Sequence, residues 1–399
     1  MLFLTYWFVY FIAALFPIYW LCRWPLIRRL ILLAGCVVFH THFAGPAGVL
    51  PIIVLSLLTY ALALTKNRWL CGAGIAASAS ALIFYKYTKF LCTQVLVAVW
   101  PGLAASASDA QPWFQNIAAP LAISFFAFEF IHYLVEVRRG RPPMKNPLDF
   151  ALFTLFWPSI VAGPVKRYQE FLPALYLGVK TVGAQDVAEG LVRVALGLVK
   201  KFAADLLTAW LAAQQQAFLN RDLDLLWRWG FLGALGLRIL WDFSGYSDMA
   251  IGFARMHGVR LPANFRWPYL AESLTEFWRR WHISLSSWIR DYIYIVLGGN
   301  RGGPARKVVN GVAAFAVCGL WHGAGWHFLA WGLYHGVGLA VNASYVRCLG
   351  PFGQFIHDVL ERRRVLAWGL TMMYVGVGWL FFFFPVKEAW RMTRLLGGM

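Results

Sequence analysis

Residues 318–336 read CGLWHGAGWHFLAWGLYHG, an apolar run about long enough to cross a bilayer as a helix. The run carries three histidines but no acid and no strong base. Histidine is the side chain whose ordinary pKa lies closest to physiological pH, so one of the three is a candidate for chemistry. Apolar runs of similar length recur from one end of the chain to the other, and together they predict an all-α membrane protein.

The composition of the whole chain supports the same prediction. Of 399 residues, 60% are hydrophobic and 14% charged, and the mean hydropathy is +0.58. Soluble domains are about 45–50% apolar and about 25% charged. No segment is polar enough to form a soluble domain. We therefore expect a single integral-membrane domain over residues 1–399, with a motif-rich region at 240–340.

Twelve segments are apolar enough to be considered as spans: 2–22, 27–44, 47–64, 69–85, 90–104, 117–136, 150–164, 186–216, 228–256, 308–324, 326–346 and 366–385. If both 69–85 and 90–104 crossed fully, the basic clusters at Lys66 and Arg138 would lie on opposite sides of the membrane. One of these two segments is therefore expected to be a half-span or a surface helix. About 10 to 12 true crossings are predicted.

The formal charge of +18 comes from short basic clusters between the apolar runs, such as Lys200–Lys201 and Arg362–Arg364. This arrangement is typical of the positive-inside bias and argues against nucleic-acid binding. It predicts contacts with anionic membrane lipid or an acidic ligand. The six cysteines form no CxxC pair, which predicts no disulfide or metal framework. The first apolar run lacks a basic n-region and is expected to be a retained helix.

Residues 242–303 do not resemble a span, because they are dense in Arg, Asp, Glu and His. A helix over residues 278–292 would have an aromatic and aliphatic stripe of Trp278, Trp281, Leu285, Trp288, Ile289 and Tyr292. The opposite side would carry Glu276, Arg279, Arg280, Ser287, Arg290 and Asp291, with His282 at the margin of the stripe. Two interpretations remain open. The helix is either interfacial, with arginines at the lipid headgroups, or inserted in the protein, with arginines on a phosphorylated or thioester ligand.

The glycine-rich LGGNRGGP at 297–304 follows this segment and cannot continue a helix. Its spacing matches neither a Walker loop nor a dinucleotide fingerprint, so a turn is the ordinary interpretation.

The three histidines of the opening run are His322, His327 and His335, and on a helix they lie about 140° and 80° apart. They share no face, and no suitable cysteine or carboxylate lies within the run, so we predict no metal site. His322 differs from the others because small residues follow it at 323–325. These residues allow room for a substrate chain or a backbone break, and a buried neutral imidazole there could act as a general base. His327 and His335 are interpreted as structural or pore-lining.

Two other polar insertions give weaker signals. Ser124, Glu129 and His132 could line the same cavity as His322 or pair with one another. The segment VAGPVKRYQEF at 161–171 is interpreted as a span end followed by a structural loop.

At these motifs the chain resembles the membrane-bound O-acyltransferase family. Within it, the nearest branch modifies bacterial polysaccharides by alginate O-acetylation or teichoic acid D-alanylation. The matching segments, in family order, are PLAISFFAFEFIHYLVEV, VAGPVKRY, DFSGYSDMAIG, NFRWPYLAESLTEFWRRWHISLSSWIRDYIYIVLGGNRGG and GLWHGAGWHFLAWGLYHG. The resemblance covers most of the chain. It implies an O-acyltransferase that binds no cofactor.

The resemblance assigns roles residue by residue. His322 matches the family's essential histidine, and His282 matches a second histidine implicated in activity. The implied fold is a ring of tilted helices around a thin centre, with re-entrant or interfacial helices, in a bacterial cytoplasmic membrane. Residues implied to line the tunnel or bind the donor are Trp278, Arg279, Arg280, Trp281, Ser284, Arg290, Asp291, Asn300, Arg301 and Trp321.

The implied donor is an acyl-CoA or acyl-carrier-protein thioester on the cytoplasmic face. The implied acceptor is an extracytoplasmic polysaccharide, reached with a periplasmic or membrane-anchored partner. The sequence departs from the alginate pattern at FFFFP (381–385), where an arginine is expected, and it ends earlier. Acetyl is therefore the first expectation for the acyl group and D-alanyl the second. A solute transporter with a histidine proton relay and a scaffold for a periplasmic enzyme remain alternatives from other classes.

Overall fold

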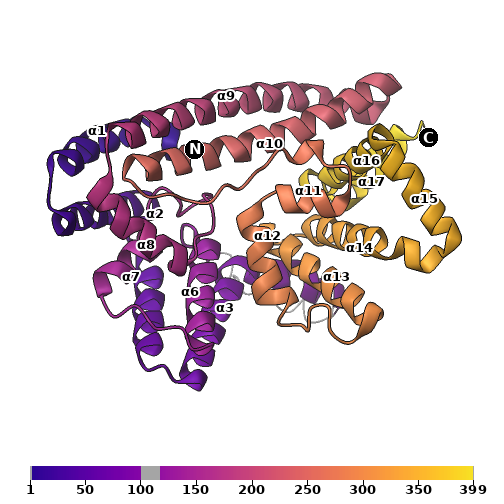
Figure 1. Cartoon of the computed structure of the whole chain (residues 1–399). Helices are drawn as coiled ribbons and strands as arrows, with labels where there is room; N and C mark the ends of the chain where they lie inside the picture. Colours follow the sequence, from indigo (N-terminus) through magenta and orange to yellow (C-terminus); the bar gives the residue numbers. More distant parts are fainter. Residues whose placement is uncertain (1, 100–116, 399) are drawn as a thin grey trace. The chain divides into compact units, whose positions relative to one another are not determined.

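The protein is described from a computed structural model, which places residues 2–99 and 117–398. Within these ranges all regular structure is helical (Figure 1). The helices of the first half are η1 (Leu2–Leu4), α1 (Tyr6–Leu21), α2 (Pro25–Leu64), α3 (Arg68–Phe90), η2 (Leu91–Val95), α4 (Leu96–Val99), α6 (Ile123–Arg138), α7 (Pro147–Leu155) and α8 (Tyr168–Thr181). They are followed by α9 (Ala184–Asn220), α10 (Leu225–Met256), η4 (Pro268–Leu270), α11 (Leu274–Arg280), α12 (Ile283–Ile289) and η5 (Arg290–Tyr294). The last are α13 (Gly303–His322), α14 (Trp326–Leu349), α15 (Pro351–Arg362), α16 (Arg364–Phe383) and α17 (Val386–Leu396).

The helices form two compact units. Unit 1 contains Met1–Ala195 and Ser247–Pro262, and unit 2 contains Leu196–Tyr246 and Ala263–Met399. The chain passes between the units three times: inside α9, inside α10, and between Pro262 and Ala263, in the segment that joins α10 to η4. The expectation of a single domain over the whole chain stays a prediction.

Several predicted spans differ from the observed helices. Segments 27–44 and 47–64 form one helix, α2, which is kinked at Gly45 (φ 66°, ψ 169°). Segment 69–85 continues without a break through 90 to Val99, and the predicted span 90–104 ends outside the described residues. Segment 150–164 is helical only to Leu155, so α7 is about 14 Å long and too short to cross a bilayer.

Three helical stretches are long and apolar enough to span a membrane: Pro25–Leu64, Arg68–Val99 and Arg364–Phe383. The shorter apolar helix α1 accompanies them. The protein is thus an all-helical membrane protein over the residues that the structure describes. The predicted number of about 10 to 12 crossings stays a prediction.

Aromatic side chains form the core of each unit. In unit 1, Phe8 and Phe39 pack on Trp157 with ring centroids 5.6 Å apart in both pairs. In unit 2, Trp331 and Trp379 lie 6.1 Å apart in a stacked arrangement. Large rings at such distances bury much apolar area in a fixed geometry. The unit 2 core surrounds the histidines that the sequence singled out.

Candidate active site

Helices α13 and α14 run side by side at close range (Figure 1). A Cβ atom on Gly319 would lie 2.2 Å from the carbonyl oxygen of Phe328, and one on Gly332 would meet the backbone of α13 at 2.3 Å. Only glycine fits at such positions. Helix α13 ends at His322, so the small residues after it mark a backbone break. The Phe328 ring fills the space beside Gly323, where a Cβ would lie 1.9 Å from it.

His322 is half-buried at the C-terminal end of α13, among three aromatic rings. Its ring centroid lies 4.8 Å from Trp321, 5.1 Å from Trp331 and 5.1 Å from Phe382. The last two rings meet the imidazole nearly edge to face, at 87° and 77°. These contacts restrict the imidazole to a narrow range of orientations, and a base must be oriented in this way before it can take a proton.

His282 lies in a turn between α11 and α12 and adopts a left-handed backbone conformation (φ 42°, ψ 53°). This conformation is strained for a residue other than glycine and persists only where the surroundings hold it. The Asn264 carbonyl oxygen accepts from Ile283 N at 2.9 Å, and the Asn264 side-chain oxygen accepts from Ser284 Oγ at 2.6 Å. These bonds fix the turn, and with it the direction of the His282 ring.

The His282 side chain is 1% exposed and lies among aromatic rings. Its ring centroid is 4.6 Å from Phe243, 6.5 Å from Phe265 and 6.2 Å from Trp321. Neither ring nitrogen has a hydrogen-bond partner among the residues that the structure describes. Burial holds the pKa of His282 well below its ordinary value, and the nearby His322 lowers this pKa further. The imidazole is therefore neutral at pH 7.

The two predicted catalytic histidines come together through one side chain. The centroid of the Trp321 ring lies 6.2 Å from that of His282 and 4.8 Å from that of His322, which follows Trp321 in the sequence. All three residues belong to unit 2, although His282 and His322 are 40 positions apart. The structure thus places both histidines beside Trp321 in an aromatic pocket, and their catalytic roles stay a prediction.

The predicted continuous helix over 278–292 is wrong. The chain leaves the helix at Trp281 and His282, and after α12 it forms a π-helical turn, η5. Such turns are often found at functional sites. The physical reason for the error is the pair of bonds from Asn264, which lies 18 positions before His282 and outside any local sequence pattern.

The aromatic stripe itself is confirmed as a buried face. Trp278, Trp281 and Trp288 are 8%, 3% and 3% exposed. Trp278 packs edge to face on Phe315 at 4.8 Å, and Trp281 lies 4.9 Å from Trp379. The stripe therefore faces protein in unit 2, which favours the inserted interpretation over a helix lying with this face on lipid.

The polar residues of the same segment lie in three different settings. Arg280 pairs with Glu276 and Arg290 with Asp291, while Ser284 is buried against Asn264. Near the glycine-rich turn, Asn300 accepts a hydrogen bond from Tyr294 at 2.6 Å. Exposed basic side chains remain on the surface of the segment: Arg279, Arg290 and Arg301.

His327 and His335 occupy different positions from His322. His335 is fully buried, 5.1 Å from both Trp278 and Trp331, and a Cβ on Gly378 would lie 2.6 Å from its Nε2. His327 is half-buried and packs on Phe328 at 4.1 Å. These contacts are those of packing side chains, in agreement with the structural interpretation of both residues.

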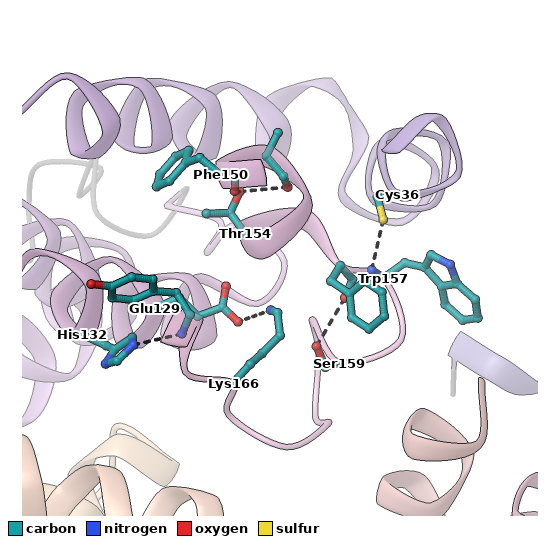
Figure 2. A network of polar contacts seen from close by, with 11 residues as sticks. Cys36, Glu129, His132, Phe150, Thr154, Trp157, Ser159 and Lys166 are labelled. Atoms are coloured by element: carbon teal, nitrogen blue, oxygen red, sulfur yellow. Dashed lines mark hydrogen bonds and ion pairs between the residues drawn. The ribbon is translucent and has the colours of Figure 1, made fainter. Parts of the chain in front are cut away.

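The other polar insertions lie in unit 1. Glu129 forms a buried ion pair with Lys166, and Tyr168 N donates to His132 Nε2 at 3.3 Å (Figure 2). Ser124 Oγ accepts from Lys86 Nζ at 3.3 Å. Lys166 belongs to the VAGPVKRY segment and its side chain is 1% exposed. Pairing between Glu129 and this loop, which the sequence pattern did not indicate, supports the structural interpretation of 161–171.

Sequence reasoning missed most of the pocket wall. Phe243, Phe265 and Phe382 contact the two histidines, and Asn264 holds the turn. Phe265 and Asn264 were inside a recognised motif, but nothing in their spacing indicated a role. Phe382 belongs to the FFFFP stretch, where the only signal in the sequence was the absence of the arginine expected from the alginate pattern. Among the described residues no group of three or more His, Cys, Asp or Glu side chains is arranged to hold a metal ion.

Comparison with known proteins gives one family. The model of the membrane-bound O-acyltransferase family matches residues 70–355, which include both histidines. A probable alginate O-acetylase of Pseudomonas aeruginosa is 37% identical over 382 residues, which cover 94% of this chain and 67% of that protein. This chain spans 67% of the length of the Pseudomonas aeruginosa relative and 52% of the length of a probable alginate O-acetylase of Pseudomonas fluorescens.

Two relatives with other acceptors also match. A peptidoglycan O-acetyltransferase of Helicobacter pylori is 33% identical, with 84% of this chain and 65% of that protein covered. A teichoic acid D-alanyltransferase of Streptococcus thermophilus is 30% identical, with 58% of this chain and 59% of that protein covered.

Proposed function

The chain belongs to the membrane-bound O-acyltransferase family, and we propose that it moves an acetyl group from a cytoplasmic thioester towards an extracytoplasmic polysaccharide. Family membership confirms the resemblance drawn from the motifs. The donor is an acyl-CoA or an acyl-carrier protein, the acceptor is a polymer such as alginate, and a periplasmic or membrane-anchored partner relays the group. No bound cofactor is required.

The observation that carries the proposal is the shared aromatic pocket of His282 and His322. The acceptor hydroxyl oxygen attacks the thioester carbonyl carbon, and the C–O bond forms as the C–S bond breaks. The hydroxyl proton passes through the His322 imidazole to the leaving thiolate. His282, neutral and without a described hydrogen-bond partner, positions the reacting groups. The surrounding rings exclude water, which would otherwise hydrolyse the thioester.

The donor is bound from the cytoplasmic side by the exposed arginines Arg279, Arg290 and Arg301, which can meet the phosphates of a coenzyme A or phosphopantetheine arm. We propose that the helices form a ring of about 10 to 12 tilted spans in the bacterial cytoplasmic membrane, with α11 and α12 lining the passage. The proposed ring accounts for a polar segment of about 60 residues in so hydrophobic a chain.

Acetyl is favoured over D-alanyl as the group transferred. The relatives described as O-acetylases or O-acetyltransferases match 94% and 84% of this chain, whereas the D-alanyltransferase matches 58% at lower identity. D-alanyl transfer to an envelope polymer is the second candidate.

The test uses a strain that lacks the gene and carries either the wild type, His322→Ala or His327→Ala. Mass spectrometry of the surface polysaccharide should show the ester with the wild type and His327→Ala, and its loss with His322→Ala. Retention of full ester content by His322→Ala would rule out the assigned role. Solute flux across vesicles without any thioester would favour a transporter with a histidine relay instead.

A further inference from the structure

A cavity of about 260 Å³ lies in unit 1, between the two arms of α2 and helix α7. The arms meet at the kink at Gly45, and each contributes lining side chains, such as Thr41 and Ile53. Helix α7 closes the cavity with Ala151 and its neighbours. The cavity is far from His282 and His322 in the sequence, and it shares no residue with the proposed active site.

The cavity suits a hydrocarbon and not a polar ligand. Its wall is almost wholly apolar. Two of the few hydroxyl groups on it are already used, because Tyr60 donates to the carbonyl of Lys145 at 2.6 Å and Thr154 to that of Phe150 at 3.1 Å. A sugar or a nucleotide would leave its polar groups without partners, at a cost of several kcal/mol.

A buried polar side chain on the wall, His40, has no described partner. His40 is 3% exposed and meets Phe126 edge to face at 5.3 Å. Neither of its ring nitrogens has a hydrogen-bond partner among the described residues. Burying an imidazole in this way is costly unless something in the cavity accepts its N–H.

The cavity opens to the surface of unit 1. Ile53 and Leu57 line it and are at the same time 48% and 64% exposed. Helix α2 is one of the helices long and apolar enough to span a membrane. Because exposed leucine and isoleucine on such a helix contact lipid tails, a lipid chain can enter the cavity directly from the bilayer.

We propose that this cavity binds one acyl chain of a membrane phospholipid, with an ester carbonyl of that lipid accepting a hydrogen bond from the His40 ring. The volume lies below the roughly 300–1,000 Å³ of sites for whole small molecules, so it suits the ester and the adjoining part of one chain. The bound lipid would fill the angle of the kinked helix. This inference does not depend on the proposed acyltransferase function.

The first experiment uses the full-length protein in nanodiscs that contain phosphatidylglycerol with a photoactivatable group on one acyl chain. Mass spectrometry should locate cross-links in residues 147–155 and 49–57. Ala151→Trp should lower the yield in residues 147–155 about tenfold, because the indole fills the cavity. Leu50→Trp is the control: Leu50 is 64% exposed on the arm of α2 that carries Ile53 and Leu57 but does not line the cavity, so its substitution should leave the yield unchanged.

The second experiment tests the hydrogen bond without filling the cavity. Native mass spectrometry should show that the wild type retains a diester phospholipid about two- to tenfold better than its diether analogue, which lacks the carbonyl. His40→Phe keeps a ring of similar size and should retain both lipids equally.

Three results would overturn the proposal. Cross-links that Ala151→Trp does not reduce would show that lipid contacts only the outer surface. Equal retention of diester and diether by the wild type would remove the role of His40. Displacement of the phospholipid by a polyprenyl phosphate at equal concentration would show that the cavity selects a different lipid.

Discussion

Two polar sites of the molecule, one in each unit, bury titratable groups in opposite ways. In unit 1, Glu129 and Lys166 lie almost without exposure, and each compensates the charge of the other (Figure 2). In unit 2, His282 is as deeply buried but neutral, and its ring nitrogens have no partner among the described residues. A buried charge that is paired within the protein has its hydrogen-bonding capacity used by the fold, whereas a neutral imidazole without a partner can still bind a substrate. His335 is also buried without a described partner, so this property alone does not identify a catalytic group, and the role of His282 stays a prediction.

The largest effect is expected when the unit 1 pair is broken. Lys166→Met leaves the Glu129 carboxylate buried without its partner and should lower the free energy of unfolding by about 3–5 kcal/mol. Thermal unfolding of the purified protein in detergent measures this loss. The double variant Lys166→Met/Glu129→Gln removes both charges and should recover much of the stability. Equal losses in the single and double variants would contradict a compensating pair.

A smaller effect, on activity and not on stability, is expected at the unit 2 site. His282→Asn should lower the rate of acyl transfer about 100-fold, because a group that positions or moves a proton contributes about that much or more. Asparagine tolerates the left-handed conformation of the turn, so the fold should remain. The ester content of the polysaccharide, with His327→Asn as control, measures the effect. Full activity in His282→Asn would make His282 a packing residue like His335.

The next largest effect is expected when the turn that holds His282 is altered. Asn264→Ala removes the acceptor of the Ser284 hydroxyl and should cost about 1–3 kcal/mol of stability. Because the bond fixes the direction of the His282 ring, acyl transfer should fall as well. Asn264→Asp keeps an acceptor and should be the milder change. If Asn264→Ala lost stability but kept the full rate per folded molecule, the turn would not position the histidine.

The smallest effect concerns pH. The pKa of His282 is lowered by burial in the native state, whereas in the unfolded chain it is ordinary, about 6.5. The unfolded state therefore binds the extra proton first as the pH falls. The stability of the native state should fall by about 1.4 kcal/mol for each unit below pH 6.5 through this group. Between pH 7.5 and 5.5 the free energy of unfolding, measured from unfolding curves, should fall more in the wild type than in His282→Asn. An equal fall in both proteins would contradict this prediction.

Local patterns predicted the parts of the site that depend on neighbouring residues. The aromatic stripe of Trp278, Trp281 and Trp288 is buried as predicted, and the small residues after His322 do end a helix. The boundary between 44 and 47 was predicted as a loop between two spans, but it is a kink within α2. A glycine and a proline in an apolar run interrupt a helix without necessarily ending it, and hydropathy does not distinguish the two outcomes.

By itself the sequence determined that this protein is an all-helical membrane protein of the O-acyltransferase family, with His322 and His282 as its candidate catalytic residues. Hydropathy and motif order depend on which residues are present, and they need no knowledge of contacts. Only the tertiary structure decided that Asn264 breaks the helix at His282, that Trp321 joins the two histidines, and that Lys166 neutralises Glu129. The Asn264–Ser284, Glu129–Lys166 and His282–Trp321 contacts join residues 20, 37 and 39 positions apart, and their energies arise only once the chain has packed.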